Sequence, residues 1–187
     1  MPKIVDHDQR RLEIGDAVLD LIASDGLERL TVRKIAAVSG WSTGVLAHYA
    51  RDKDDMITLA VTSMTERFAD RLRAVDLADP RTALHAVLRE LLPLDTVRRT
   101  EAIAWFRLAA YDADGSGSAS AIRKGHRLLR RLVADLLVEI DDDLDSATTA
   151  AELIALADGL AIHDLVDPRG MARTKTERVL EARLAQI

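Results

Sequence analysis

Apolar residues recur every three or four positions along most of the chain, the spacing that gives a helix one buried face. The first stripe predicts a helix over about residues 8–24 that ends at Gly26. Later stripes predict helices over 52–72, 96–112, 121–140, 147–165 and 174–186, and one from Asp79-Pro80 towards Leu92-Pro93. No stretch of useful length alternates as a β-strand does. The pattern therefore predicts an all-α protein of about nine helices.

The segment from Thr31 to Lys53, TVRKIAAVSGWSTGVLAHYARDK, predicts two short helices joined by a tight turn. Thr31 stands just before an apolar run, where its hydroxyl can cap the first helix. Gly40 can take the left-handed conformation that ends this helix, and Ser42 can cap the second. A short helix held by a companion and polar on its outer side fits the major groove of DNA.

The two sides of the second helix differ in size and polarity. The inward side is expected to carry Val45, Leu46 and Tyr49. The outward side is expected to carry Thr43, Gly44, Ala47 and His48. Small and polar groups of the second kind can reach phosphates or base edges, whereas Trp41 at the turn is expected to wedge between helices.

These residues resemble the helix-turn-helix of the TetR family of bacterial transcriptional regulators, and the resemblance covers about residues 8–60. The family pattern runs from a threonine-capped helix to a tyrosine and then to a lysine that opens the next helix. The matching positions are Thr31, Ile35, Ala36, Gly40, Ser42, Gly44, Leu46, His48, Tyr49 and Lys53. Gly40-Trp41 with Ser42, Gly44 and His48-Tyr49 is most similar to the branch that includes the betaine- and choline-responsive repressors. The family usually has a large aromatic at Ala50, and its loss should loosen the anchoring of the reading helix. It often has an aromatic at Ala47 as well, and the loss of that ring bears on phosphate contact or base choice.

The resemblance implies a homodimer, by default a repressor, that leaves a palindromic DNA operator when a small-molecule effector binds and pivots the helix over 52–72. It implies a helix-turn-helix domain over residues 1–55 and an effector-binding and dimerisation domain, a helical bundle, over 56–187. Tyr49 and Lys53 resemble the phosphate contacts of the family. The expected DNA-binding residues are Thr31, Arg33, Ser42, Thr43, Gly44, His48, Tyr49 and Lys53.

The last two long helices carry apolar stripes that could form a four-helix interface between two chains. The stripes consist of Leu153, Leu156, Ala157, Leu160, Ala161, Val179, Leu180, Arg183, Leu184 and Ile187. Small residues such as Ala157 and Ala161 allow helices to approach closely. The same stripes could instead close the core of a single chain, and the pattern leaves this alternative open. A dimer could present two reading helices about 34–36 Å apart to a palindrome.

Three of the six aromatic residues, Trp105, Phe106 and Tyr111, lie close together on one predicted helix. This concentration indicates an effector cavity walled by rings, in which a cationic ligand would be favoured. The same rings could equally fill an ordinary core. The expected effector-binding residues are Met64, Phe68, Trp105, Leu108, Tyr111, His126 and Asp158.

The composition is that of a foldable chain, with 48% hydrophobic and 30% charged residues. The net charge of −5 opposes DNA binding, but residues 29–53 hold five cations against one anion, a local charge of +4. This cationic segment predicts a strongly salt-dependent DNA contact. The chain has no cysteine, no apolar run of about 18 residues and no signal-peptide pattern, so we expect a cytoplasmic protein.

The sequence offers no constellation for catalysis, since it has no glycine-rich phosphate loop and no histidine pair at metal-ligand spacing. We therefore expect no enzymatic activity, no cofactor and no metal. Asp141-Asp142-Asp143 could attract a cation, but three consecutive aspartates at a helix end are not expected to converge without a loop around the ion. The alternative function is a small-molecule-binding or scaffolding helical dimer that has lost DNA binding, which Ala50 and the acidic balance favour.

Overall fold

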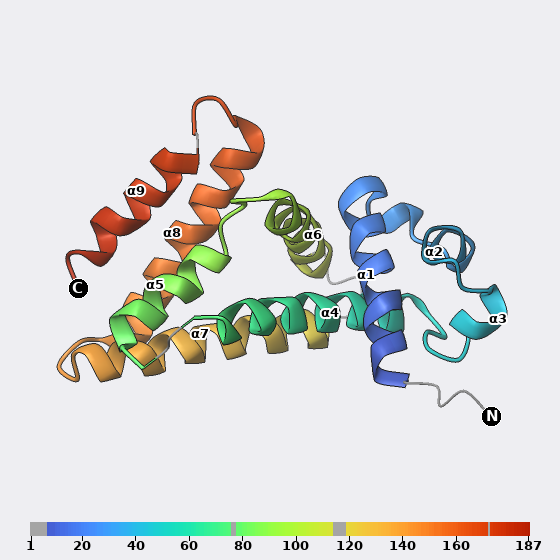
Figure 1. The fold of residues 1–187 in the computed structure, drawn as a ribbon, viewed down its shortest axis with the longest axis horizontal. Coiled ribbons are helices and arrows are strands. Elements are labelled where there is room, and N and C mark those ends of the chain that lie inside the picture. The colour runs from blue at the N-terminus through green and yellow to red at the C-terminus, as the bar shows by residue number, and fades with distance from the viewer. Residues whose placement is uncertain (1–6, 76–77, 114–118, 172) are drawn as a thin grey trace. The chain divides into compact units, whose positions relative to one another are not determined.

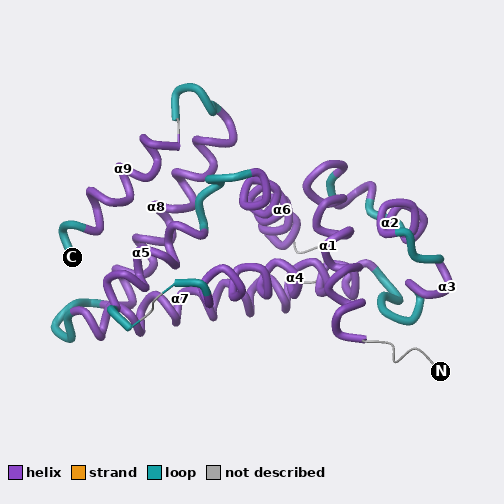
Figure 2. Tube along the Cα trace, viewed as in Figure 1, coloured by secondary structure: helices purple, strands orange, loops and turns teal. Residues whose placement is uncertain are grey.

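The structure, a computed structural model, describes residues 7–75, 78–113, 119–171 and 173–187. These residues form nine α-helices and one short 3₁₀ helix, and none of them lies in a strand (Figures 1 and 2). The all-α prediction is confirmed. The helices are α1 (His7–Asp25), α2 (Val32–Ser39), α3 (Thr43–Leu46), α4 (Lys53–Arg73), α5 (Pro80–Glu90), α6 (Thr96–Ala113), α7 (Ala119–Ile140), α8 (Ser146–Val166) and α9 (Arg173–Leu184). Within this described part, none of the helices combines the length and apolar character that a membrane span requires.

Three helices begin at the capping residues that the sequence predicts. The hydroxyl of Thr31 accepts a hydrogen bond from the backbone N–H of Lys34, and α2 follows. The hydroxyl of Ser42 accepts from the N–H of Val45 at the start of α3. The carboxylate of Asp79 accepts from the N–H of Thr82 at 2.8 Å, directly before the proline that opens α5.

The start of the last helix differs from its prediction. The sequence Thr174-Lys175-Thr176-Glu177 has the pattern of a capping box, which predicts a helix that starts after Thr174, but α9 begins at Arg173, so Thr174 lies inside the helix. The carboxylate of Glu177 instead accepts hydrogen bonds from Nε and Nη2 of Arg89 on α5, at 3.0 and 2.7 Å. A charged partner from another helix therefore engages the side chain that the box would have used. The Gly/Ser-rich sequence DADGSGSAS over residues 112–120 predicts a loop, and most of it lies outside the described residues.

The chain divides into two compact units, and neither unit is one continuous segment. The first unit contains residues 1–67 and 104–125, and the second contains 68–103 and 126–187. Helices α4, α6 and α7 each contribute to both units, and α4 runs across the domain boundary predicted between residues 55 and 56.

The core of the first unit joins the N-terminal helices to the second half of α6. Ile14, Val18 and Ile22 of α1 are essentially inaccessible to solvent, as are Ala104 and Leu108 of α6. Each fully buried aliphatic side chain of this size contributes about 1.5–3 kcal/mol of transfer free energy. Residues 104–113 therefore help to hold the N-terminal helices together.

Helices α1 and α4 pack at a distance that only glycine permits. A Cβ atom added to Gly15 would lie 2.4 Å from the backbone carbonyl oxygen of Leu59 and 2.9 Å from Cβ of Ser63. On the next residue, the carboxylate of Asp16 accepts from the hydroxyl of Ser63 and pairs with Arg67 at 2.7 Å. The middle of α4 is thus fixed to α1 by close backbone contact and by polar pairing.

The second unit has a separate apolar core made by α5, α7, α8 and α9. Helices α8 and α9 lie side by side, and α5 contacts both of them (Figure 1). Four residues of the predicted dimer stripes belong to this core, with exposed fractions of 4% or less: Leu153, Ala157, Leu160 and Leu180. Ala161, on the same helix as the first three, is buried as well. The side chains of these residues therefore close the core of their own chain. This is the alternative to a dimer interface that the sequence pattern left open.

A buried ion-pair network joins the end of α4 to α5 and α6 within the second unit. The guanidinium of Arg71 donates to both carboxylate oxygens of Glu101, at 2.7 and 3.2 Å, and also pairs with Glu90. Nε of Arg98 donates to Glu90 at 3.0 Å. Burial raises the pKa of the Glu90 carboxyl, but the hydrogen bonds and charges of Arg98 and Arg71 outweigh it and leave the pKa below its usual value.

Candidate nucleic-acid interface

Helices α2 and α3 form a helix-turn-helix whose turn depends on Gly40. This residue has φ of 73° and ψ of 2°, in the left-handed region, and its N–H donates to the carbonyl of Ala36 at 3.1 Å. A side chain at this position would strain the backbone, so glycine allows the chain to leave α2 and enter α3 within three residues. Regular α-helix in α3 covers only Thr43–Leu46, and tighter i to i−3 hydrogen bonds extend it through Tyr49.

The outward side of α3 is the side that the sequence predicts. Leu46 is 2% exposed and Ala50 is 4% exposed, and both belong to the core of the first unit. Val45 and Tyr49 are half-buried. The exposed residues of this segment are Ser42, Thr43, Gly44, Ala47 and His48. Burial on one side therefore leaves a small, polar surface on the other, and Thr31 and Arg33 at the start of α2 are exposed as well.

Two residues expected to bind phosphate have partners within the first unit. The hydroxyl of Tyr49 lies 2.9 Å from Nδ1 of His7 at the start of α1. The ammonium of Lys53, the first residue of α4, lies 4.6 Å from the ring centroid of Tyr111 on α6, a cation–π contact. Lys53 is half-buried, so its charge is held near the start of α4 rather than far out in solvent.

Neighbouring carboxylates reduce the positive charge counted from the sequence. Lys34 forms an ion pair with Asp25, and this hydrogen bond lowers the pKa of the Asp25 carboxyl. Arg51 pairs with Asp55 at 3.1 Å, and the backbone N–H of Arg51 donates to the same carboxylate at 2.9 Å. Asp25 and Asp55 lie outside residues 29–53, over which the charge of +4 was counted. Because they pair with cations of that segment, the folded segment is less positive than the count indicates.

The comparisons with known proteins match this architecture along the whole chain. The family described as BetI-type transcriptional repressor, C-terminal, matches residues 80–187. The HTH-type transcriptional regulator PksA of Bacillus subtilis is 31% identical over 100% of this chain and 94% of its own length. The chain belongs to the TetR family of transcriptional regulators. The HTH-type transcriptional regulator BetI of Escherichia coli K12 is 28% identical over 94% of this chain and 92% of its own length.

Solved structures of family members share the fold. A transcriptional regulator from Rhodococcus sp. RHA1 is 30% identical, with a TM-score of 0.81 and coverage of 95% of both chains. A regulator from Saccharomonospora viridis, solved in complex with choline, has a TM-score of 0.78 at 22% identity and covers 94% of this chain and 95% of its own. The protein is thus a helix-turn-helix transcriptional regulator whose C-terminal part is of the repressor type, and its relatives are regulators rather than enzymes.

The seven residues expected to bind the effector are divided between the two units. Met64, Trp105, Leu108 and Tyr111 pack in or against the core of the first unit. Phe68, His126 and Asp158 belong to the second unit, where Phe68 packs against the apolar core. Burial raises the pKa of the Asp158 carboxyl, and the charge of His126 opposes this by a smaller amount.

Two arginines that the sequence did not single out hold the first unit together. Nη1 of Arg107 on α6 donates to the backbone carbonyl of Ile22, near the end of α1, at 2.7 Å. The guanidinium carbon of Arg10 lies 4.3 Å from the ring centroid of Trp41, which is half-buried against the same core. Both contacts join residues more than 30 positions apart, and no local pattern reveals such pairs.

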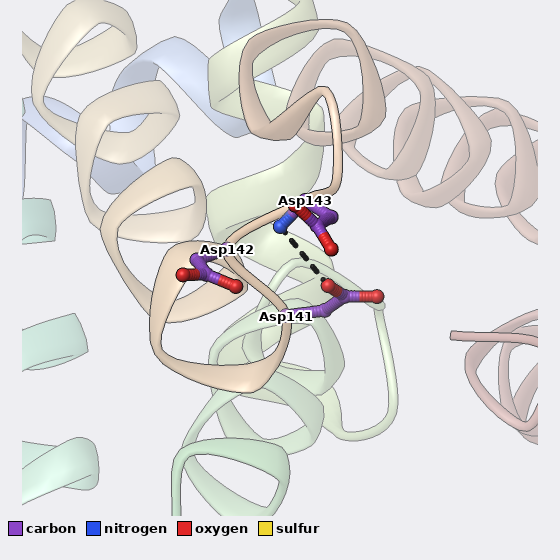
Figure 3. A group of neighbouring side chains, drawn as sticks. All are labelled: Asp141, Asp142 and Asp143. Carbon is purple, nitrogen blue, oxygen red and sulfur yellow. Dashed lines mark hydrogen bonds between the residues drawn. The ribbon is translucent and has the colours of Figure 1, made fainter.

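The three consecutive aspartates lie close together. They occupy the turn after α7, and their nearest carboxylate oxygens lie within 4.8 Å of one another (Figure 3). The backbone N–H of Asp143 donates to Oδ1 of Asp141 at 3.1 Å. The prediction denied convergence only in the absence of a loop, and these aspartates lie in a tight turn rather than in the helix itself. All three are exposed, and nothing else in the turn indicates a bound ion.

Proposed function

We propose that the outward side of α3 reads an operator in the DNA major groove while the residues around it hold the phosphates. Thr43 and His48 can donate to base edges or phosphates, and Gly44 lets the backbone approach the groove. Ser42, Thr31 and Arg33 lie at the starts of the two helices, where backbone N–H groups also favour an anion. Tyr49 and Lys53 would contribute a phenolic hydroxyl and an ammonium to the backbone of the duplex. The observation that supports this most directly is the exposure of Thr43 and His48 beside the buried Leu46.

We propose that the regulator acts in the cytoplasm as a homodimer formed by α8 and α9, through a face different from the predicted stripes. The outer side of α8 carries Ala151, Ala155 and Gly159, followed by Ile162 and Val166, which are 43% and 79% exposed. A Cβ atom at Gly159 would meet nothing within 4 Å in its own chain. Small residues four positions apart let a second helix approach closely. Val179 of α9, 37% exposed, can extend this face.

We propose that a small cationic effector releases the regulator from its operator and contacts the second unit at Phe68, His126 and Asp158. A carboxylate whose pKa is raised by burial gains from a positive charge beside it. The choline complex of the Saccharomonospora viridis regulator supports a quaternary ammonium as the first probe. The predicted effector residues of the first unit are Met64, Trp105, Leu108 and Tyr111, and α4 is the helix proposed to move.

Replacing Lys53 and Thr43 should weaken DNA binding in different ways. Lys53→Ala removes one phosphate contact, so the slope of log affinity against log salt should become shallower by about 0.9. Thr43→Ala should leave that slope unchanged but alter the operator preferred in a selection from randomised duplexes. Fluorescence anisotropy over a salt series measures the slopes. A wild-type chain that binds no duplex at low salt would establish the alternative, a helical dimer without DNA binding.

Replacing Gly159 should separate the dimer without unfolding the chain. Gly159→Leu places a bulky side chain where the proposed partner helix approaches, and dimer dissociation should rise by at least about tenfold, or 1.4 kcal/mol. Gly125→Leu on α7 is the matched control, because a Cβ atom there also meets nothing within 4 Å. Analytical ultracentrifugation measures both. Equal dissociation constants for Gly159→Leu and the wild type would place the interface elsewhere.

Choline binding should depend on the ionised form of Asp158. Asp158→Asn should weaken binding about tenfold, or 1.4 kcal/mol, in isothermal titration calorimetry, whereas Asp142→Asn, at an exposed position, should leave it unchanged. Because burial raises the pKa of Asp158 above 3.8, wild-type affinity should be highest well above that pKa and fall as the pH is lowered through it. An Asp158→Asn variant that binds as tightly as the wild type at neutral pH would remove the carboxylate from the effector site.

A further inference from the structure

The ammonium of Lys53 contacts an aromatic ring although carboxylates are close in sequence. The carboxylate of Asp55 accepts from the backbone and the Nε of Arg51, and that of Asp52 accepts from the N–H of Asp55 at 2.9 Å. These acids are therefore engaged in capping the start of α4. The charged group of Lys53 lies instead over the ring of Tyr111, 4.6 Å from its centroid.

An aromatic ring and a carboxylate differ in how far they leave the ammonium of Lys53 available to bind a DNA phosphate. An ion pair would compete directly with phosphate for the charge, because the carboxylate would have to be displaced first. A ring attracts the ammonium through its quadrupole and occupies only one side of it, so N–H donors on the other side can still bind an anion. The contact thus confines a flexible side chain, and none of the carboxylates in the described part of the chain forms an ion pair with it.

The position of Tyr111 is determined by the core of the first unit. One turn earlier on α6, Leu108 is fully buried in that core, and Arg107 is bonded to the carbonyl of Ile22 on α1. Tyr111 itself packs against the same core. The ring is therefore carried by a helix segment that is anchored to α1 at two consecutive residues.

We propose that Tyr111 is a positioning residue for DNA binding, whose ring holds the ammonium of Lys53 ready for a backbone phosphate. This inference rests on the proposed phosphate contact of Lys53. A free lysine side chain loses rotamer entropy when its head group is fixed. The ring reduces that loss before DNA arrives, because the side chain is already confined. Residue 111 thereby sets the strength of a contact that it does not itself make.

A double-mutant cycle on the full-length chain tests this role, with a labelled mixed-sequence DNA duplex as the probe. In the wild-type background, Tyr111→Leu should weaken binding about two- to tenfold, and Tyr111→Phe should bind like the wild type because it keeps the ring. In the Lys53→Ala background, Tyr111→Leu should have no further effect. A merely structural role for the ring would weaken binding equally in both backgrounds.

Pentafluorophenylalanine at position 111 provides a version of the test that preserves the packing. It keeps the shape of a phenyl ring but reverses the quadrupole, so it should reproduce the loss seen with Tyr111→Leu even if that variant unfolds. Equal or tighter binding with the fluorinated ring, or a Tyr111→Leu effect that persists without Lys53, would overturn the proposal. If Lys53→Ala leaves the salt slope unchanged, the phosphate contact itself fails. If that slope becomes shallower while the ring replacements are neutral, only the role of Tyr111 fails.

Discussion

The function of this regulator depends on a one-sided burial of the short helix α3. Leu46 and Ala50 are held in the core of the first unit, and the left-handed turn at Gly40 brings α3 to that core directly after α2. With one side fixed in this way, Thr43 and His48 have to face solvent. The same residues on a helix buried all round could contact nothing outside the chain, and a helix without the core contact would have no defined orientation.

The core that orients α3 is completed by residues far along the chain. Ala104 and Leu108 of α6 are buried among the N-terminal helices, and Arg107 is bonded to the end of α1. Since α6 begins in the second unit and ends in the first, the helix-turn-helix is not an independent module. The long helix α4 offers a second connection, because it carries Lys53 at one end and the buried Arg71 network at the other.

Local features of the fold could be predicted because their causes are local. Thr31, Ser42 and Asp79 cap helices through hydrogen bonds to residues three positions away, and the requirement for glycine at position 40 is a property of one backbone angle. The outward residues of α3 follow from helical periodicity alone. Contacts between distant segments could not be predicted in this way, because their partners share no periodic relation.

The helix pair α8–α9 illustrates this limit. Both helices have apolar residues on more than one side, so the pattern could not distinguish the side that closes the core from the side available to another chain. Leu153, Ala157 and Leu160 were assigned to the dimer but lie in the core, whereas Ile162 and Val166 remain exposed. Likewise, the sequence shows the aromatic residues of α6 but not the contact between the ring of Tyr111 and the ammonium of Lys53. In both cases the sequence showed which residues the helix contains but not which residues it contacts.

The orientation of α3 towards DNA can be measured directly because the chain contains no cysteine. A single cysteine introduced by Ala47→Cys, on the exposed side of α3, can carry a tethered iron chelate that cleaves nearby DNA. If α3 enters the major groove, a selected operator should be cleaved at two half-sites separated by about 34–36 Å, one for each subunit of a dimer. The unmodified, cysteine-free chain treated with the same reagent should give none. Cleavage no stronger than in that control would contradict the placement of α3 in the groove.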